Sequence, residues 1–205
     1  MFKTLFKTLL WTAAAAPVSL TVDQQCVLDW LNNKVVPFAR DSGKRQPMAL
    51  ITGPPGAGKS FAVKVFKKEQ QAANRSVPAT AYTGIATILA EGVDMVCGLV
   101  GMGWADNSQN GTLPPLSAVA LEPFCERVGL STILALIIDE ISTVPGRLIE
   151  ALSQRFQQAT GDASRPFGGI PVIFVGDFNQ LPPVGSVTVI RALLQSEKRK
   201  ADRAK

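Results

Sequence analysis

The chain has 205 residues, enough for one domain with a sizeable hydrophobic core. Hydrophobic residues make up 46% of it and charged residues 18%, which excludes a disordered polyelectrolyte. The net charge of +5 favours a polyanionic partner. Because the sequence contains no histidine, Ser-His-Asp and Cys-His catalysis are excluded, and any catalysis must use carboxylates, lysine, arginine or a metal.

The first 19 residues differ in character from the rest. Up to Ala16 they contain no acid, and apolar residues recur at helical spacing around Lys3 and Lys7. We interpret residues 1–19 as a separate basic amphipathic segment, with a targeting segment, a surface helix and a disordered segment as the alternatives. Neither this segment nor any other is an apolar run of about 18 residues, so we expect no stable membrane association.

From Leu20 onward, helical and strand patterns alternate. The patterns predict helices at 22–36, 61–73 and, weakly, 116–128, and strands at 48–52, 77–82, 134–138 and 171–175. The last two strands are continuous apolar runs, which is typical of strands buried on both faces of a parallel sheet. The stretch 106–115 is expected to form a surface loop, and 191–205 a charged tail.

Cysteines and tryptophans carry weaker signals. Cys26, Cys97 and Cys125 form no C-x-x-C pair, and without histidine they cannot complete a zinc site, so we expect reduced, buried thiols. Trp11 and Trp30 are expected to be core or loop anchors. Trp104, in a glycine-rich loop, is the better candidate for stacking on a nucleic-acid base.

A complete phosphate-loop pattern, G-x-x-x-x-G-K-S/T, follows the first expected strand directly. It consists of Gly53, Pro54, Pro55, Gly56, Ala57, Gly58, Lys59 and Ser60. Glycines let the backbone turn its N–H groups toward phosphate oxygens, and the helix that follows adds its positive end. We expect Lys59 to reach the β and γ phosphates of ATP and Ser60 to ligate Mg²⁺. The alternative is a tight strand-to-helix turn with an exposed lysine.

Two further polar segments each close a buried strand. Asp139 and Glu140 follow one strand, where Asp139 could hold Mg²⁺ and Glu140 could deprotonate a water for attack on the γ-phosphate. The alternative is a helix start with acids placed favourably for its dipole. The segment 176–184 closes the other strand, and Gln180 within it is a candidate γ-phosphate sensor.

Together these motifs resemble the first motor domain of the PIF-type, RecD-like helicases of superfamily 1B. The resemblance runs from about Leu20 to Val184, and its most specific segments are 53–60, 136–144 (LIIDEISTV) and 166–184 (PFGGIPVIFVGDFNQLPPV). It implies an α/β P-loop NTPase fold of the RecA-like type, three layers around a mostly parallel sheet, over residues 20–190. It also implies that Gln24 reads adenine and that Thr83 and Gly84 touch the backbone of single-stranded DNA.

The activity implied by this resemblance is ATP- and Mg²⁺-dependent translocation on single-stranded DNA with unwinding at duplex junctions. Such motors serve DNA repair, recombination and telomere maintenance, inside the cell, in the nucleus or mitochondrion of eukaryotes. We expect a fragment without the family's second motor domain, whose arginines close on the γ-phosphate. The alternatives are an ATP-binding remnant that associates with a full-length helicase relative, or another P-loop ATPase without unwinding activity.

Two positions depart from the family pattern. Cys97 stands at a position that is usually histidine, in a segment that couples nucleotide state to DNA grip, and Thr143 stands where methionine is common.

Overall fold

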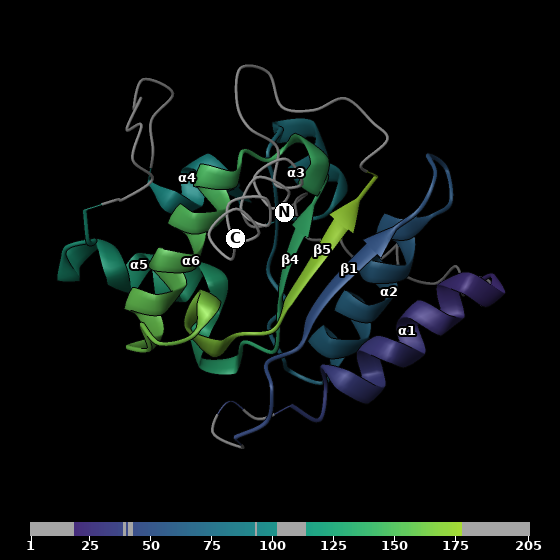
Figure 1. Ribbon diagram of the computed structural model, residues 1–205, viewed down its shortest axis with the longest axis horizontal. Helices are drawn as coiled ribbons and strands as arrows, with labels where there is room; N and C mark the ends of the chain where they lie inside the picture. Colours follow the sequence, from purple (N-terminus) through teal and green to yellow (C-terminus); the bar gives the residue numbers. More distant parts are fainter. Residues whose placement is uncertain (1–18, 39, 41–42, 93, 102–113, 178–205) are drawn as a thin grey trace, which may run out of the picture.

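Five parallel strands form the centre of the computed structural model, which describes residues 19–38, 40, 43–92, 94–101 and 114–177 (Figure 1). The strands are β1 (Met48–Thr52), β2 (Ala79–Ala81), β3 (Asp94–Met95), β4 (Leu136–Asp139) and β5 (Val172–Gly176). They pair in the order β1-β5-β4-β2-β3, and every pair is parallel. The expected parallel sheet is therefore confirmed.

Helices cover both faces of this sheet (Figure 1). On one side lie α1 (Val22–Lys34) and α2 (Lys59–Ala72), and on the other lie α4 (Val96–Val100), α5 (Ala118–Val128) and α6 (Gly146–Thr160). The short helix α3 (Gly84–Leu89) follows β2. Single 3-10 turns occupy η1 (Leu130–Thr132), η2 (Ile141–Thr143) and η3 (Pro166–Gly169). The three-layer α/β arrangement agrees with the expected fold class.

The central strands divide the hydrophobic core in two because successive side chains of a strand point to opposite faces. In β4, Leu136 and Ile138 pack against α4, α5 and α6, while Ile137 packs against α1 and α2. Val172 and Ile173 of β5 divide in the same way. Burial on both faces explains why these strands read as unbroken apolar runs.

The predicted elements are mostly confirmed, with shifted ends. β1 has the predicted bounds, whereas β2 covers only the middle of the predicted strand 77–82. Helix α6 was not predicted, although Leu148, Leu152 and Phe156 repeat at helical spacing and are buried. Residues 1–18, 106–113 and 191–205 lie outside the described residues, as do Trp11 and Trp104.

Two expectations about burial are wrong. All three cysteines are free thiols, but Cys26 is exposed and Cys97 and Cys125 are only partly buried. Trp30, expected to be a core or loop anchor, is 42% exposed. Both Cys26 and Trp30 lie on α1, whose buried contacts come from Leu28 and Leu31 instead.

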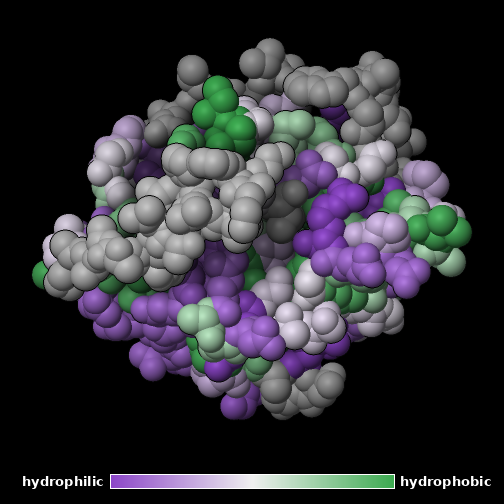
Figure 2. Space-filling view, turned by 180° about the vertical axis from the view of Figure 1, so that it is seen from behind, coloured by the Kyte–Doolittle hydropathy of each residue, from purple (hydrophilic) through white to green (hydrophobic). Residues whose placement is uncertain are grey.

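Figure 2 shows that hydrophobic patches interrupt a mostly hydrophilic surface on the opposite side of the molecule from Figure 1. No described helix is long and apolar enough to cross a membrane.

A buried arginine ties α6 to two other segments. Arg155 is 4% exposed, and its Nε donates a hydrogen bond to the Val100 carbonyl at 3.0 Å. Its Nη1 donates to the Pro114 carbonyl at 2.7 Å. The guanidinium thus satisfies the last carbonyl of α4 and a carbonyl of the chain leading into α5.

We predict that Arg155→Met lowers the free energy of unfolding by about 1–3 kcal/mol, because the buried Val100 carbonyl loses its charged hydrogen-bond donor. Urea denaturation followed by circular dichroism measures the change. The matched control is Arg147→Met on the same helix, where the side chain is exposed and the expected change is within about 0.5 kcal/mol. Equal stability of the two variants would contradict the bridging role of Arg155.

Candidate nucleotide-binding site

The phosphate-loop residues lie between the end of β1 and the start of α2, as the motif predicts. Gly56 and Gly58 adopt left-handed backbone angles, with φ of 79° and 75°. L-residues with a Cβ rarely take such angles, so the loop depends on glycine here. Gly58 is also the N-terminal cap of α2, and the loop therefore leads directly onto the positive end of that helix.

Gln24 packs against this loop from α1. Its side-chain oxygen accepts a hydrogen bond from the Thr21 backbone N–H at 3.0 Å, which completes a capping box at the start of α1. Its Nε2 donates to the Ala57 carbonyl at 3.4 Å. A Cβ at position 58 would collide with the Gln24 amide, so a larger residue there would move the Gln24 side chain out of its present position.

Lys59, the first residue of α2, folds its side chain back over the loop. Its ammonium donates hydrogen bonds to the carbonyls of Gly53 at 2.6 Å and Pro54 at 3.0 Å. Both acceptors are neutral backbone groups, so an anion at the mouth of the loop can replace them as the partner of the ammonium.

The loop and the acidic pair meet across the sheet. The Ser60 hydroxyl donates to Asp139 Oδ2 at 3.0 Å, although the two residues are 79 positions apart. Asp139 is 8% exposed, and its other oxygen accepts the backbone N–H of Glu140 at 2.8 Å. A hydroxyl and a carboxylate are hard oxygen donors of the kind that Mg²⁺ prefers, with phosphate and water completing the coordination. Among the described residues no group of three or more histidine, cysteine, aspartate or glutamate side chains could hold a metal by itself.

Glu140 has a distinct environment from that of Asp139. It adopts a left-handed backbone with φ of 50° just before η2, and its carbonyl accepts the Thr143 hydroxyl at 2.8 Å. Thr143 thus stabilises the strained turn through its hydroxyl, where methionine is common in the resembled family. Burial, and then the neighbouring Asp139 carboxylate, raise the pKa of Glu140 above its ordinary value.

A cavity of about 290 Å³ joins the acidic pair to α3. Ser60, Asp139 and Glu140 border it on one side, and Ala86 and Leu89 on the other. The elements expected to bind nucleotide and DNA therefore share one cavity.

The residues expected to touch DNA begin α3. Both Thr83 and Gly84 are exposed, and the Thr83 hydroxyl caps the helix by accepting the Ala86 backbone N–H at 3.2 Å. Behind them, Ile85, Ile88 and Leu89 form an apolar stripe that is 62 to 77% exposed. Such i, i+3, i+4 spacing usually predicts burial, so the sequence pattern alone would have placed this stripe in the core.

The segment with the unusual cysteine packs beside β2. Asp94 forms an ion pair with Arg127 of α5, with 3.0 Å between the carboxylate oxygen Oδ2 and the guanidinium nitrogen Nη1. A Cβ at position 98 would lie only 2.6 Å from the two oxygens of this carboxylate. Burial raises the pKa of the Cys97 thiol. Gly98 therefore accommodates the Asp94 carboxylate.

The structure thus brings together Gln24, the loop 53–60, Asp139 and Glu140, and connects them through the cavity to α3. Gln180 lies outside the described residues, which end in this region at Asp177. The sequence analysis missed one residue beside this site, Lys67, which lines a small cavity together with Ser60 and Asp139. Lys67 of α2 is 5% exposed, and its ammonium donates to the Glu91 carbonyl just beyond α3. A lysine on a buried helix face was the available signal.

Known proteins share both this sequence and this fold. The chain is 36% identical over 138 residues to the ATP-dependent DNA helicase Pif1 of Bdellovibrio bacteriovorus, covering 66% of this chain and 29% of that protein. It is 29% identical over 191 residues to the ATP-dependent DNA helicase RRM3 of Saccharomyces cerevisiae, covering 90% and 24%. The chain thus spans less than a third of the length of these curated relatives.

Solved structures of Pif1 helicases also resemble this chain. The Pif1 helicase from Bacteroides in complex with ADP-AlF3 and single-stranded DNA superimposes with a TM-score of 0.62 at 25% identity, covering 88% of this chain and 37% of that one. The Pif1 helicase from Candida albicans superimposes with a TM-score of 0.58 at 26% identity, covering 82% and 34%. The sequence pattern of the PIF1-like helicases matches residues 19–198. The chain therefore belongs to the PIF1-like helicase family.

Proposed function

We propose that this chain is the ATP-binding motor domain of a DNA helicase, over residues 20–190. The carrying observation is the 3.0 Å hydrogen bond from Ser60 to Asp139, which joins the phosphate loop to the acidic pair. The binding of ADP-AlF3 and single-stranded DNA by the Bacteroides relative supports the same ligand classes here. The resulting activity is ATP hydrolysis coupled to translocation on single-stranded DNA and to duplex unwinding.

The residues divide the work of ATP hydrolysis among them. Gln24 binds the adenine edge through its amide, the loop 53–60 binds the phosphates through backbone N–H groups, and Lys59 exchanges its carbonyl partners for phosphate oxygens. Ser60 and Asp139 would hold Mg²⁺, which would supply positive charge to neutralise the phosphates. Glu140 orients the attacking water and accepts its proton.

DNA contact falls to the start of α3 in this proposal. Thr83 and Gly84 are exposed and offer a hydroxyl and an uncovered backbone to phosphate groups. The shared cavity connects α3 to the acidic pair, so loss of the γ-phosphate can alter the packing of α3. Gln180 completes the proposed site as the γ-phosphate sensor.

We predict that Lys59→Ala weakens ATP binding by about tenfold or more, because a charged hydrogen bond to phosphate contributes about 1.5–3 kcal/mol. Isothermal titration calorimetry with ATP and Mg²⁺ measures the affinity. Lys68→Ala is the matched control, since Lys68 lies on the exposed side of the same helix. Unchanged affinity in Lys59→Ala would contradict the phosphate site.

Removal of Mg²⁺ tests the Ser60–Asp139 pair. In the parent chain we expect EDTA to weaken ATP binding. In Asp139→Asn we expect the affinity measured with Mg²⁺ to fall to the value measured with EDTA, because a neutral amide is a poorer ligand for this cation. Glu126→Gln, an exposed acid on α5, should keep the full Mg²⁺ effect. A Mg²⁺ effect that survives in Asp139→Asn would place the cation elsewhere.

Hydrolysis by the 205-residue polypeptide alone is expected to be very slow, without unwinding. Arginines that close on the γ-phosphate contribute about 10³- to 10⁵-fold in rate, and the resembled family carries them on a second motor domain. Glu140→Gln should lower the residual rate by a further 10²- to 10⁴-fold, roughly the usual effect of losing a general base, while ATP binding persists. Single-turnover assays with radiolabelled ATP measure both. DNA-stimulated turnover at ordinary enzyme rates by this polypeptide would refute the expectation.

A further inference from the structure

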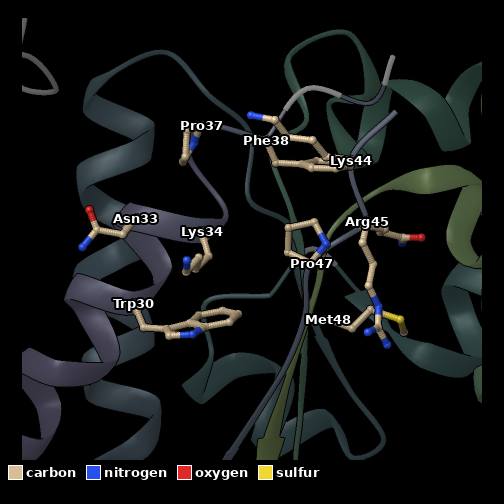
Figure 3. A pocket seen from close by; sticks show the side chains of 10 residues that line it. Trp30, Asn33, Lys34, Pro37, Phe38, Lys44, Arg45, Pro47 and Met48 are labelled. Atoms are coloured by element: carbon tan, nitrogen blue, oxygen red, sulfur yellow. The ribbon is translucent and has the colours of Figure 1, made fainter. Parts of the chain in front are cut away.

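Another cavity lies at the end of β1 that is remote from the phosphate loop. It has a volume of about 380 Å³ and is bounded by α1 on one side and by the chain entering β1 on the other (Figure 3). We call it the basal pocket and define it by Trp30, Lys34, Phe38, Lys44, Arg45 and Met48. From Met48 to Thr52 the strand spans about 13 Å, so this pocket is separate from the nucleotide site.

The aromatic wall of the basal pocket comes from α1. Trp30 extends its indole from the helix toward β1, and Lys34 lies one helical turn further along the same side (Figure 3). Trp30 is 42% exposed, so this large aromatic residue is accessible from solvent. Phe38 adds a second ring to the lining. Exposed aromatic faces of this kind are the platforms on which nucleic-acid bases stack.

Among the described residues that line the basal pocket, every charged side chain is basic. Lys34, Lys44 and Arg45 all line it, and none of the ten residues lining the cavity is acidic. The side chains of Lys34 and Arg45 are exposed to solvent. A ligand that satisfies this pocket carries negative charge close to a flat aromatic ring.

Both walls of the pocket are held in place without a ligand. The Gln46 amide donates hydrogen bonds to the carbonyls of Pro166 at 3.1 Å and Ile170 at 2.5 Å, which fixes the strand side to η3 and the start of β5. On the helix side, Asn32 accepts a hydrogen bond from Gln70 of α2 at 3.3 Å. A preformed pocket loses little conformational entropy when it binds.

We propose that the basal pocket binds one nucleotide unit of single-stranded nucleic acid, as a second contact remote from α3. The base stacks on Trp30, and the adjoining phosphates bind Lys34 and Arg45. The volume suits one base with its phosphate. An acidic peptide would use the cations but leave the indole unpaired, so the combination of ring and charge favours a nucleotide. This contact extends the proposed DNA-binding function and does not require bound ATP in order to form.

Intrinsic fluorescence provides a local test. In the full chain with Trp11→Phe and Trp104→Phe, Trp30 is the remaining tryptophan. We expect a short oligothymidylate to quench its fluorescence. Lys34→Gln should weaken this binding. It should also make the negative slope of log K against log salt shallower by about 0.7, the effect of one lost phosphate contact on a single strand. The matched control, Lys68→Gln, should leave both values unchanged.

Three results would overturn the proposal. The first is the absence of quenching at oligothymidylate concentrations that saturate the protein by fluorescence anisotropy. The second is an identical response of Lys34→Gln and Lys68→Gln. The third is equal quenching by polyglutamate, which would make the pocket a site for acidic peptides. In Lys59→Ala, oligothymidylate should quench the Trp30 fluorescence as it does in the parent. A failed ATP site and a failed basal pocket are therefore distinguished, because only the second abolishes this quenching.

Discussion

The hydrogen bond between Ser60 and Asp139 is the interaction around which the rest of the site is arranged. It forms because β1, β5 and β4 run parallel, so that Thr52 and Gly176 pair at the same edge where β4 ends in Asp139. At this edge β5 can approach η2 closely because it ends in glycine, and a Cβ at position 176 would lie 2.9 Å from Ile141. A larger residue there would push η2, and with it Glu140, away from the phosphate loop.

Much of this arrangement could be predicted from the sequence because its signals are local. The phosphate loop, the strand before it and the helix after it occupy consecutive residues. Unbroken apolar runs predict β4 and β5. The bounds of β2 were overestimated because Val77 and Tyr82 have high strand propensity but lie beyond the ladder with β4. Propensity cannot show where a neighbouring strand stops.

Exposure was the harder property to predict. The stripe of Ile85, Ile88 and Leu89 has core-like spacing, yet Ala86 and Thr87 take the inward positions of α3. Trp30 likewise lies beside the buried stripe of α1 instead of within it. In both cases the decisive information is which side of a short helix meets the sheet, and this is fixed by tertiary packing that spacing alone does not encode.

Helix α1 touches both of the sites described above. Gln24 in its first turn contacts the phosphate loop, and Trp30 and Lys34, further along, line the basal pocket. A helix of 13 residues is about 20 Å long, and α1 thus links the two sites along its length. If ATP shifts α1 through Gln24, the affinity of the basal pocket changes as well. Thermodynamic linkage then requires a strand bound in that pocket to change ATP affinity by the same factor.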